Sequence, residues 1–197
     1  MPADSPGKKP ERQLPPQDPI RTDGSRVAYA ELHCLSNYSF LRGASFPEEL
    51  VNRAVELGYQ ALAITDECSL AGAVRAHVAA KAQNLKLLVG SELILDEGCH
   101  LVLLAGNRAG YGRLSHLLSC ARRQSPKGSY SLDRALLEKE LPRDCQLIWL
   151  PELQQPPEQL ACQAVWLRRL FAGDLWIGVQ LLLRGDDRQR LRRLQAL

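Results

Sequence analysis

Histidine and carboxylate side chains stand at or near the ends of several predicted strands in this chain of 197 residues. His33 ends the first strand, Asp66 and Glu67 follow the second, Glu92 lies in the third, and His100 begins the fourth. Functional polar groups in α/β sheets gather at the carboxyl ends of the strands. Imidazole and carboxylate groups bind divalent metals, and a metal pair can cleave a phosphate ester by generating hydroxide and holding the phosphoryl oxygens. The five residues are therefore candidate metal ligands.

Each candidate ligand also has a purely structural interpretation. A single histidine at a strand end is more often hydrogen-bonded than dedicated to a metal. Asp66 and Glu67 suit the N-terminus of the helix that follows them. Glu92 needs a partner because it lies inside an apolar strand, where an unpaired carboxylate is costly to bury. His77 and His116 fall within predicted helices and are interpreted as ordinary surface or core residues.

Alternating strands and helices are expected to position these side chains. Apolar runs and helical periodicity predict strands at 27–35, 59–65, 85–95, 100–106, 145–150 and 175–183, and helices at 45–58, 70–84, 110–123, 132–141, 157–171 and 186–197. Ser45 with Glu48 predicts a capping box for the first helix, and Ser131 is the predicted cap of the fourth. DEGC at 96–99 predicts a hairpin turn. The pattern indicates a mostly parallel sheet covered by helices, and leaves both a barrel and an open doubly wound sheet possible.

The composition is typical of a soluble globular domain, with 45% hydrophobic residues, 24% charged residues and a formal net charge of +3. Six cysteines without a CxxC pair indicate reduced thiols in a cytoplasmic protein. No apolar run is long enough to span a bilayer. Residues 1–26, rich in proline and charge, predict a disordered leader before a folded unit at 27–197. The final helix has no stop signal, so we expect the chain to be part of a longer protein.

Four stretches resemble, in order and spacing, the start of bacterial C-family DNA polymerases, which are relatives of the polymerase III alpha subunit. They are YAELHCLSNYSFLRGAS, ALAITDECSLAGAVRAH, LKLLVGSEL and HLVLLAGNRAGYGRLSHLLS. The first two are characteristic of the error-prone branch. In that family the region is the PHP domain, named for polymerase and histidinol phosphatase. The resemblance implies an α/β fold, a distorted β/α barrel of the PHP type that is incomplete at the C-terminus of this chain, with the polymerase core absent.

The chain departs from the metal-binding members of this family. Their opening motif is His-x-His, whereas here His33 is followed by Leu35. Because residues two apart in a strand share a face, we expect Leu35 to point into the same site. Arg42 replaces an acidic residue of related polymerases, and its fixed charge would repel a metal and neutralise nearby carboxylates. We therefore expect a degenerate site without catalytic residues or bound metal, in which the remaining candidate ligands are His33, Asp66, Glu67, Glu92 and His100.

The resemblance also implies what the parent protein does. An error-prone DNA polymerase adds deoxynucleotides to a DNA 3′ end in translesion synthesis and damage-induced mutagenesis, with Mg²⁺ in the polymerase core. Its implied partners are DNA, deoxynucleotides, the sliding clamp and other mutagenesis proteins, but no membrane, and its implied location is the cytoplasm. Two alternatives stay open. The segment could be a metal-dependent phosphoesterase or 3′–5′ exonuclease, or the chain could be a free-standing barrel enzyme such as a histidinol phosphatase.

Overall fold

The structure is a computed structural model that describes residues 28–181, 183 and 185–195. The leader predicted at 1–26 and the last two residues of the helix predicted at 186–197 lie outside the described residues. Among the residues that are described, no helix combines the length and the apolar composition needed to cross a membrane.

Six strands form one mixed sheet in which the spatial order follows the sequence order. The first three strands pair in parallel, the third and fourth and the fourth and fifth pair antiparallel, and the last pair is parallel. The predicted hairpin at 96–99 joins the third and fourth strands, with Gly98 at a positive φ of 80°. The strands are β1 (Ala30–Cys34), β2 (Ala61–Ile64), β3 (Lys86–Ile94), β4 (His100–Ala105), β5 (Cys145–Leu150) and β6 (Leu175–Ile177).

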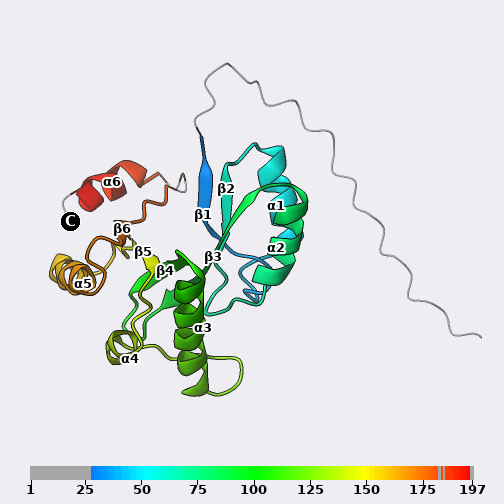
Figure 1. The fold of residues 1–197 in the computed structure, drawn as a ribbon. Helices are drawn as coiled ribbons and strands as arrows, with labels where there is room; N and C mark the ends of the chain where they lie inside the picture. The colour runs from blue at the N-terminus through cyan, green and yellow to red at the C-terminus, as the bar shows by residue number, and fades with distance from the viewer. Residues whose placement is uncertain (1–27, 182, 184, 196–197) are drawn as a thin grey trace, which may run out of the picture.

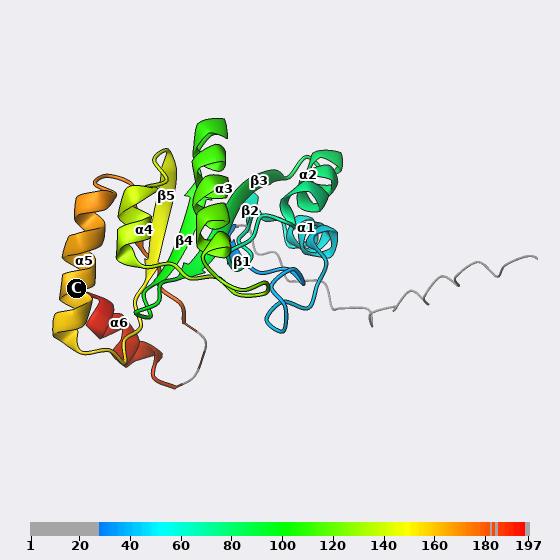
Figure 2. The same ribbon diagram turned by 90° about the horizontal axis from the view of Figure 1, so that it is seen from below.

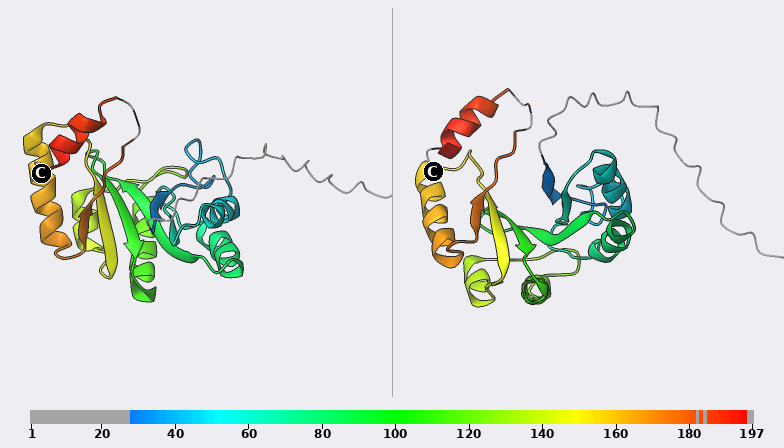
Figure 3. Two further views of the ribbon diagram at one scale, coloured as in Figure 1. Left: turned by 90° about the horizontal axis from the view of Figure 1, so that it is seen from above. Right: turned by 45° about the horizontal axis from the view of Figure 1, so that its top comes forward.

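Helices α1 to α5 lie on the outer side of this sheet, which curls into a half-barrel, and α6 lies near its open end (Figure 1). Seen along the curl, the strands line the inside of a horseshoe, and β1 faces β6 across its opening (Figure 3). The expectation of a distorted, incomplete β/α barrel is thereby confirmed. The helices are α1 (Pro47–Glu56), α2 (Ala73–Ala82), α3 (Arg108–Arg123), α4 (Arg134–Lys139), α5 (Pro157–Leu170) and α6 (Asp187–Gln195).

Strand alternation divides the apolar side chains between the two faces of the sheet. The outward face of β3–β5 belongs to a large core, which includes Leu93, Leu101 and Trp149 and is covered by α3, α4 and α5. A second core packs β2 against α1 and α2. The inward face carries a smaller apolar cluster that includes Val102 and Leu104. The cores hold the carboxyl ends of β1, β2 and β3 next to one another.

Several local predictions are corrected by the structure. The N-cap of the first helix is Phe46 and not Ser45, one residue later than predicted, and the backbone N–H of Phe46 donates to Glu49 Oε2 at 2.8 Å. Asp133, and not Ser131, caps α4 by accepting from the N–H of Leu136. Ser131 donates instead to Asp96. The strand predicted at 175–183 is only three residues long, since pairing with β5 ends at Ile177.

Candidate functional site

Arg42 lies between the carboxylates of Glu67 and Glu92 at the carboxyl ends of β2 and β3. Its Nη1 atom is 2.7 Å from Glu67 Oε2 and 2.8 Å from Glu92 Oε1. Its Nη2 atom donates to Glu92 Oε2 at 3.2 Å. The contact with Glu92 Oε1 is an ion pair without an aligned hydrogen bond. The planar guanidinium therefore joins two acidic groups that arrive from different strands.

A tight loop between β1 and α1 presents Arg42 to the site. Ser39 O accepts backbone N–H groups from Arg42 at 3.0 Å and from Gly43 at 2.9 Å. A Cβ atom at Gly43 would lie 1.9 Å from Ser36 O, so the loop closes only with glycine at this position. The close approach of the backbone at Gly43 holds the neighbouring Arg42 over the strand ends.

Asp66 anchors the same loop. Its side chain accepts the N–H and the hydroxyl of Ser36 and the hydroxyl of Ser39, each at 2.7 Å. The residue is 1% exposed, so these donors supply the partners that a buried carboxylate requires. Ser39 Oγ also accepts the backbone N–H of Glu67 at 3.0 Å. Asp66 is thus oriented toward the loop serines, which the sequence analysis had not identified as partners.

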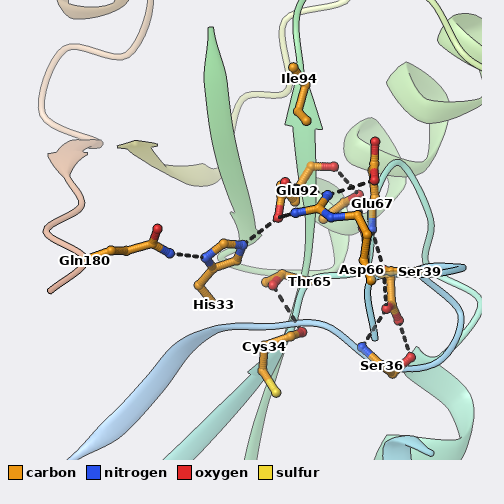
Figure 4. A network of polar contacts seen from close by, with 12 residues as sticks. His33, Cys34, Ser36, Ser39, Thr65, Asp66, Glu67, Glu92, Ile94 and Gln180 are labelled. Atoms are coloured by element: carbon orange, nitrogen blue, oxygen red, sulfur yellow. Dashed lines mark hydrogen bonds and ion pairs between the residues drawn. The ribbon is translucent and has the colours of Figure 1, made fainter. Parts of the chain in front are cut away.

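His33 links Glu92 to the segment that follows β6 (Figure 4). Its Nε2 atom is 2.7 Å from Glu92 Oε2, and its Nδ1 atom is 2.8 Å from Gln180 Nε2. The hydrogen-bond network assigns the proton to Nε2, which donates to the carboxylate, while Nδ1 accepts from the amide. Gln180 is separated from His33 by 147 positions in the chain, so no local sequence pattern could have revealed the contact.

Tyr130 completes the surroundings of Glu67. Its hydroxyl donates to Glu67 Oε1 at 3.2 Å and accepts the backbone N–H of Ile94 at 3.1 Å. Arg122, on α3, donates to the carbonyl of Glu67 at 3.2 Å, and its guanidinium lies 5.4 Å from the centre of the Tyr130 ring. The side chain of Glu67 and the side chain of Glu92 are therefore each contacted by partners from more than one segment of the chain.

Burial and pairing act in opposite directions on the ionisation of this cluster. Burial of Glu92, which is 1% exposed, would raise its pKa, but the hydrogen bonds from His33 and Arg42 and the charge of Arg42 outweigh burial and lower the pKa. Burial likewise acts to lower the pKa of Arg42, and its hydrogen bonds to Glu92 and Glu67 more than reverse that effect. Glu92 is thus held as a carboxylate by its partners.

The structure brings together His33, Glu67, Glu92 and Arg42, as expected from their predicted strand ends and loop. His100 pairs with Ile94 on the ladder between β3 and β4, and within the described part of the chain it has no polar contact with these four residues. By register His100 shares the inward face with Glu92, which lies two positions before Ile94 on β3.

Leu35 lies one residue beyond the end of β1 and is half-buried. The register of β1 against β2 is irregular between Glu31 and Cys34. The expectation that Leu35 shares a face with His33 rests on strand alternation, and it stays a prediction because Leu35 lies outside β1.

The family model described as "PHP domain" matches residues 31–150 of this chain. An error-prone DNA polymerase of Methylococcus capsulatus is 53% identical over 173 residues, which cover 88% of this chain and 16% of that protein. An error-prone DNA polymerase of Dechloromonas aromatica is 53% identical over 173 residues, covering 86% of this chain and 16% of that protein. The chain thus spans about 16% of the length of these curated relatives.

Solved structures confirm the likeness at the level of the fold. An amidohydrolase from Chromobacterium violaceum, with bound sulfate and no metal, superposes with a TM-score of 0.64 at 16% identity. The match covers 86% of this chain and 84% of that one. The superposition shows the fold alone, whereas the sequence matches confirm the resemblance to PHP domains and to error-prone DNA polymerases.

Proposed function

Because this chain belongs to the PHP domain family, we propose that it is the N-terminal PHP segment of an error-prone DNA polymerase. The parent protein would add deoxynucleotides to a DNA 3′ end in translesion synthesis and damage-induced mutagenesis. The identity of 53% to a curated error-prone DNA polymerase supports the proposal. The polymerase chemistry and its Mg²⁺ would belong to a core outside this segment. DNA, deoxynucleotides, the sliding clamp and other mutagenesis proteins would be partners of the parent, in the cytoplasm.

Within this parent we propose that the segment is a structural module and not a hydrolase. The observation that carries the proposal is the position of Arg42, within 2.8 Å of an oxygen of both Glu67 and Glu92. A metal pair needs carboxylate and imidazole lone pairs that are free to bind it. The two glutamates instead face a fixed cation, and the Nε2 atom of His33 is hydrogen-bonded to Glu92.

Asp66 is equally unsuited to a metal, because three donors from Ser36 and Ser39 occupy its side chain. These residues do not fit a metal pair, so we derive no hydrolytic step from them. The cluster instead ties the β1–α1 loop to the ends of β2 and β3. Such a buried and paired network is suited to bracing the half-barrel, which would support an attached polymerase core.

A second candidate function is a metal-dependent phosphoesterase or 3′–5′ exonuclease. It is favoured by the convergence of His33, Glu67 and Glu92 at adjacent strand ends, where α/β barrels place their catalytic groups. Under that function the guanidinium of Arg42 would have to leave the carboxylates when a metal arrives. The two functions therefore differ in whether the site binds metal in competition with Arg42.

Titration of the chain with Mn²⁺ by calorimetry, together with hydrolysis of bis(p-nitrophenyl) phosphate, tests the structural module. We expect no heat that depends on His33 and no turnover above the background of a His33→Ala variant. Micromolar Mn²⁺ binding or phosphodiester hydrolysis that is lost in His33→Ala would overturn the proposal and support the second candidate.

The proposal for the parent is tested separately by primer extension opposite an abasic template site, using the full-length product of the gene. Lack of nucleotide addition by that protein would contradict it.

A further inference from the structure

A second cluster of metal-binding side chain types lies on the outer side of the sheet, away from Arg42. His116 and Cys120 are four residues apart on α3, a spacing that places both on one face of the helix. Glu140 is the C-cap residue of α4, which packs against α3 on the same side of the sheet (Figure 2). From the sequence His116 is an ordinary helical residue, and only the packing of α4 against α3 brings Glu140 to it.

The three possible ligand atoms form a compact triangle. His116 Nε2 is 3.1 Å from Glu140 Oε2 and 3.6 Å from Cys120 Sγ, and all three atoms lie within 4.8 Å of one another. Tetrahedral zinc has bonds of about 2.0–2.1 Å to nitrogen, about 2.3 Å to sulfur and about 2.0–2.2 Å to oxygen. These bonds separate the nitrogen from the sulfur by about 3.6 Å and from the oxygen by about 3.4 Å. Both separations agree with the structure to within a few tenths of an ångström, which a small rotamer change supplies.

We propose that His116, Cys120 and Glu140 form a three-ligand site for Zn²⁺ or a similar borderline transition metal. Imidazole and thiolate ligands select this class over Mg²⁺ and Ca²⁺, which prefer oxygen ligands alone. Three protein ligands leave the fourth tetrahedral position open to water. Binding replaces the contacts of His116 with Glu140 and Cys120 by three metal–ligand bonds, and the thiol of Cys120 releases its proton to solvent.

The surroundings allow an ion to reach the site. The side chain of His116 is 63% exposed, and it lines a pocket of about 470 Å³ together with Glu140. The Nζ atom of Lys139 lies 3.6 Å from Glu140 Oε1, which leaves Oε2 to the metal. Arg113 also lines the pocket, but its guanidinium is paired with Asp144. A thiolate and a carboxylate together balance the two charges of the ion.

Cobalt provides the direct test, because Co²⁺ bound to a thiolate gives a near-ultraviolet charge-transfer band and visible bands typical of tetrahedral coordination. We expect one equivalent of Co²⁺ to produce these bands in the chain, and Zn²⁺ to displace it. The Cys120→Ser variant should lose the charge-transfer band. The His116→Ala variant should bind Co²⁺ more weakly than the unchanged chain. The loss of affinity should be at least the roughly 10- to 100-fold that removal of an outer-shell partner causes. His116 is exposed, and Cys120 is partly buried against the large core, where serine nearly keeps the volume of cysteine, so both variants should fold.

Two other cysteines serve as matched controls. Cys162→Ser changes an exposed cysteine on α5, and Cys34→Ser changes the cysteine next to His33. Both variants should keep the cobalt bands of the unchanged chain. As a second measurement, Zn²⁺ should raise the thermal midpoint of the unchanged chain and of both controls, but not that of Cys120→Ser. The absence of a charge-transfer band, or its persistence in Cys120→Ser, would overturn the proposal.

Discussion

Replacing Arg42 by methionine tests whether a side-chain cation holds the strand ends together. Methionine keeps an unbranched apolar stem but removes the guanidinium, which contacts Glu67 and Glu92. Glu92 would then stay buried with His33 as its remaining side-chain partner. The variant therefore removes one partner from a buried ionic cluster while the core packing of the half-barrel is unchanged.

The expected loss of stability follows from the burial of the two partners. Removing one member of a buried ion pair typically costs roughly 3–5 kcal/mol. Here Glu92 is 1% exposed, but the side chain of Arg42 is 38% exposed, so solvent screens part of the interaction. We expect the free energy of unfolding to fall by about 2–3 kcal/mol. For a chain of this size the thermal midpoint should fall by roughly 4–12 °C.

Chemical denaturation and thermal unfolding measure this loss, and pH identifies its origin. The partners of Glu92 lower its pKa from the ordinary value of 4.5. A pKa that is lower in the folded than in the unfolded protein stabilises the folded state at pH values above the unfolded pKa. This stabilisation is lost as the pH falls through the folded pKa. Without Arg42 its hydrogen bond and its charge no longer lower the pKa of Glu92, so that pKa rises. The difference in unfolding free energy between the unchanged chain and Arg42→Met should thus be fully present at pH 7 and shrink below pH 4.5.

Two further variants and a metal complete the experiment. Arg42→Lys keeps the charge but not the planar fork, so its stability should be intermediate. Arg169→Met, which removes an exposed ion pair with Glu138, should cost less than about 1 kcal/mol. Mn²⁺ should raise the thermal midpoint of Arg42→Met more than that of the unchanged chain, because two carboxylates are left without their cation. An Arg42→Met variant as stable as the unchanged chain at pH 7 would refute the reasoning.

Three other substitutions have definite expected outcomes. Asp66→Ala leaves three donors without their acceptor and should lower the unfolding free energy by about 3 kcal/mol or more in urea titrations, and a loss below 1 kcal/mol would contradict the anchoring role. Gln180→Ala should cost less than about 1 kcal/mol yet speed amide exchange in 175–181, and unchanged exchange would show that its bond to His33 does not hold this segment. Trp149→Ala should cost about 3–5 kcal/mol by leaving a cavity, because Trp149 is 1% exposed. Trp176→Ala, at a side chain that is 60% exposed, is its control, and equal losses in the two would be inconsistent with the described core.

Local sequence patterns were sufficient to predict most of the fold. Strand and helix periodicity depends on neighbours within a few residues, so every strand and helix was anticipated, with errors of one to several residues at the ends. The end of β6 was missed because LWIGVQLLL remains apolar beyond Ile177, whereas strand pairing with β5 stops there. The cap of α4 was missed because Ser131 and Asp133 are both good caps, and the competing bond of Ser131 to Asp96 is a tertiary contact.

The same distinction applies to the two sites. By itself the sequence determined that His33, Asp66, Glu67 and Glu92 lie at adjacent strand ends, because parallel strands align their carboxyl ends and apolar runs locate them. Tertiary structure alone decided which partners these groups use, in particular the serines that bind Asp66 and the Gln180 amide that binds His33. It also decided that Glu140 meets His116, across a separation of 24 positions in the chain. Periodicity reports only contacts within one element, whereas the choice of a polar partner depends on how separate elements pack.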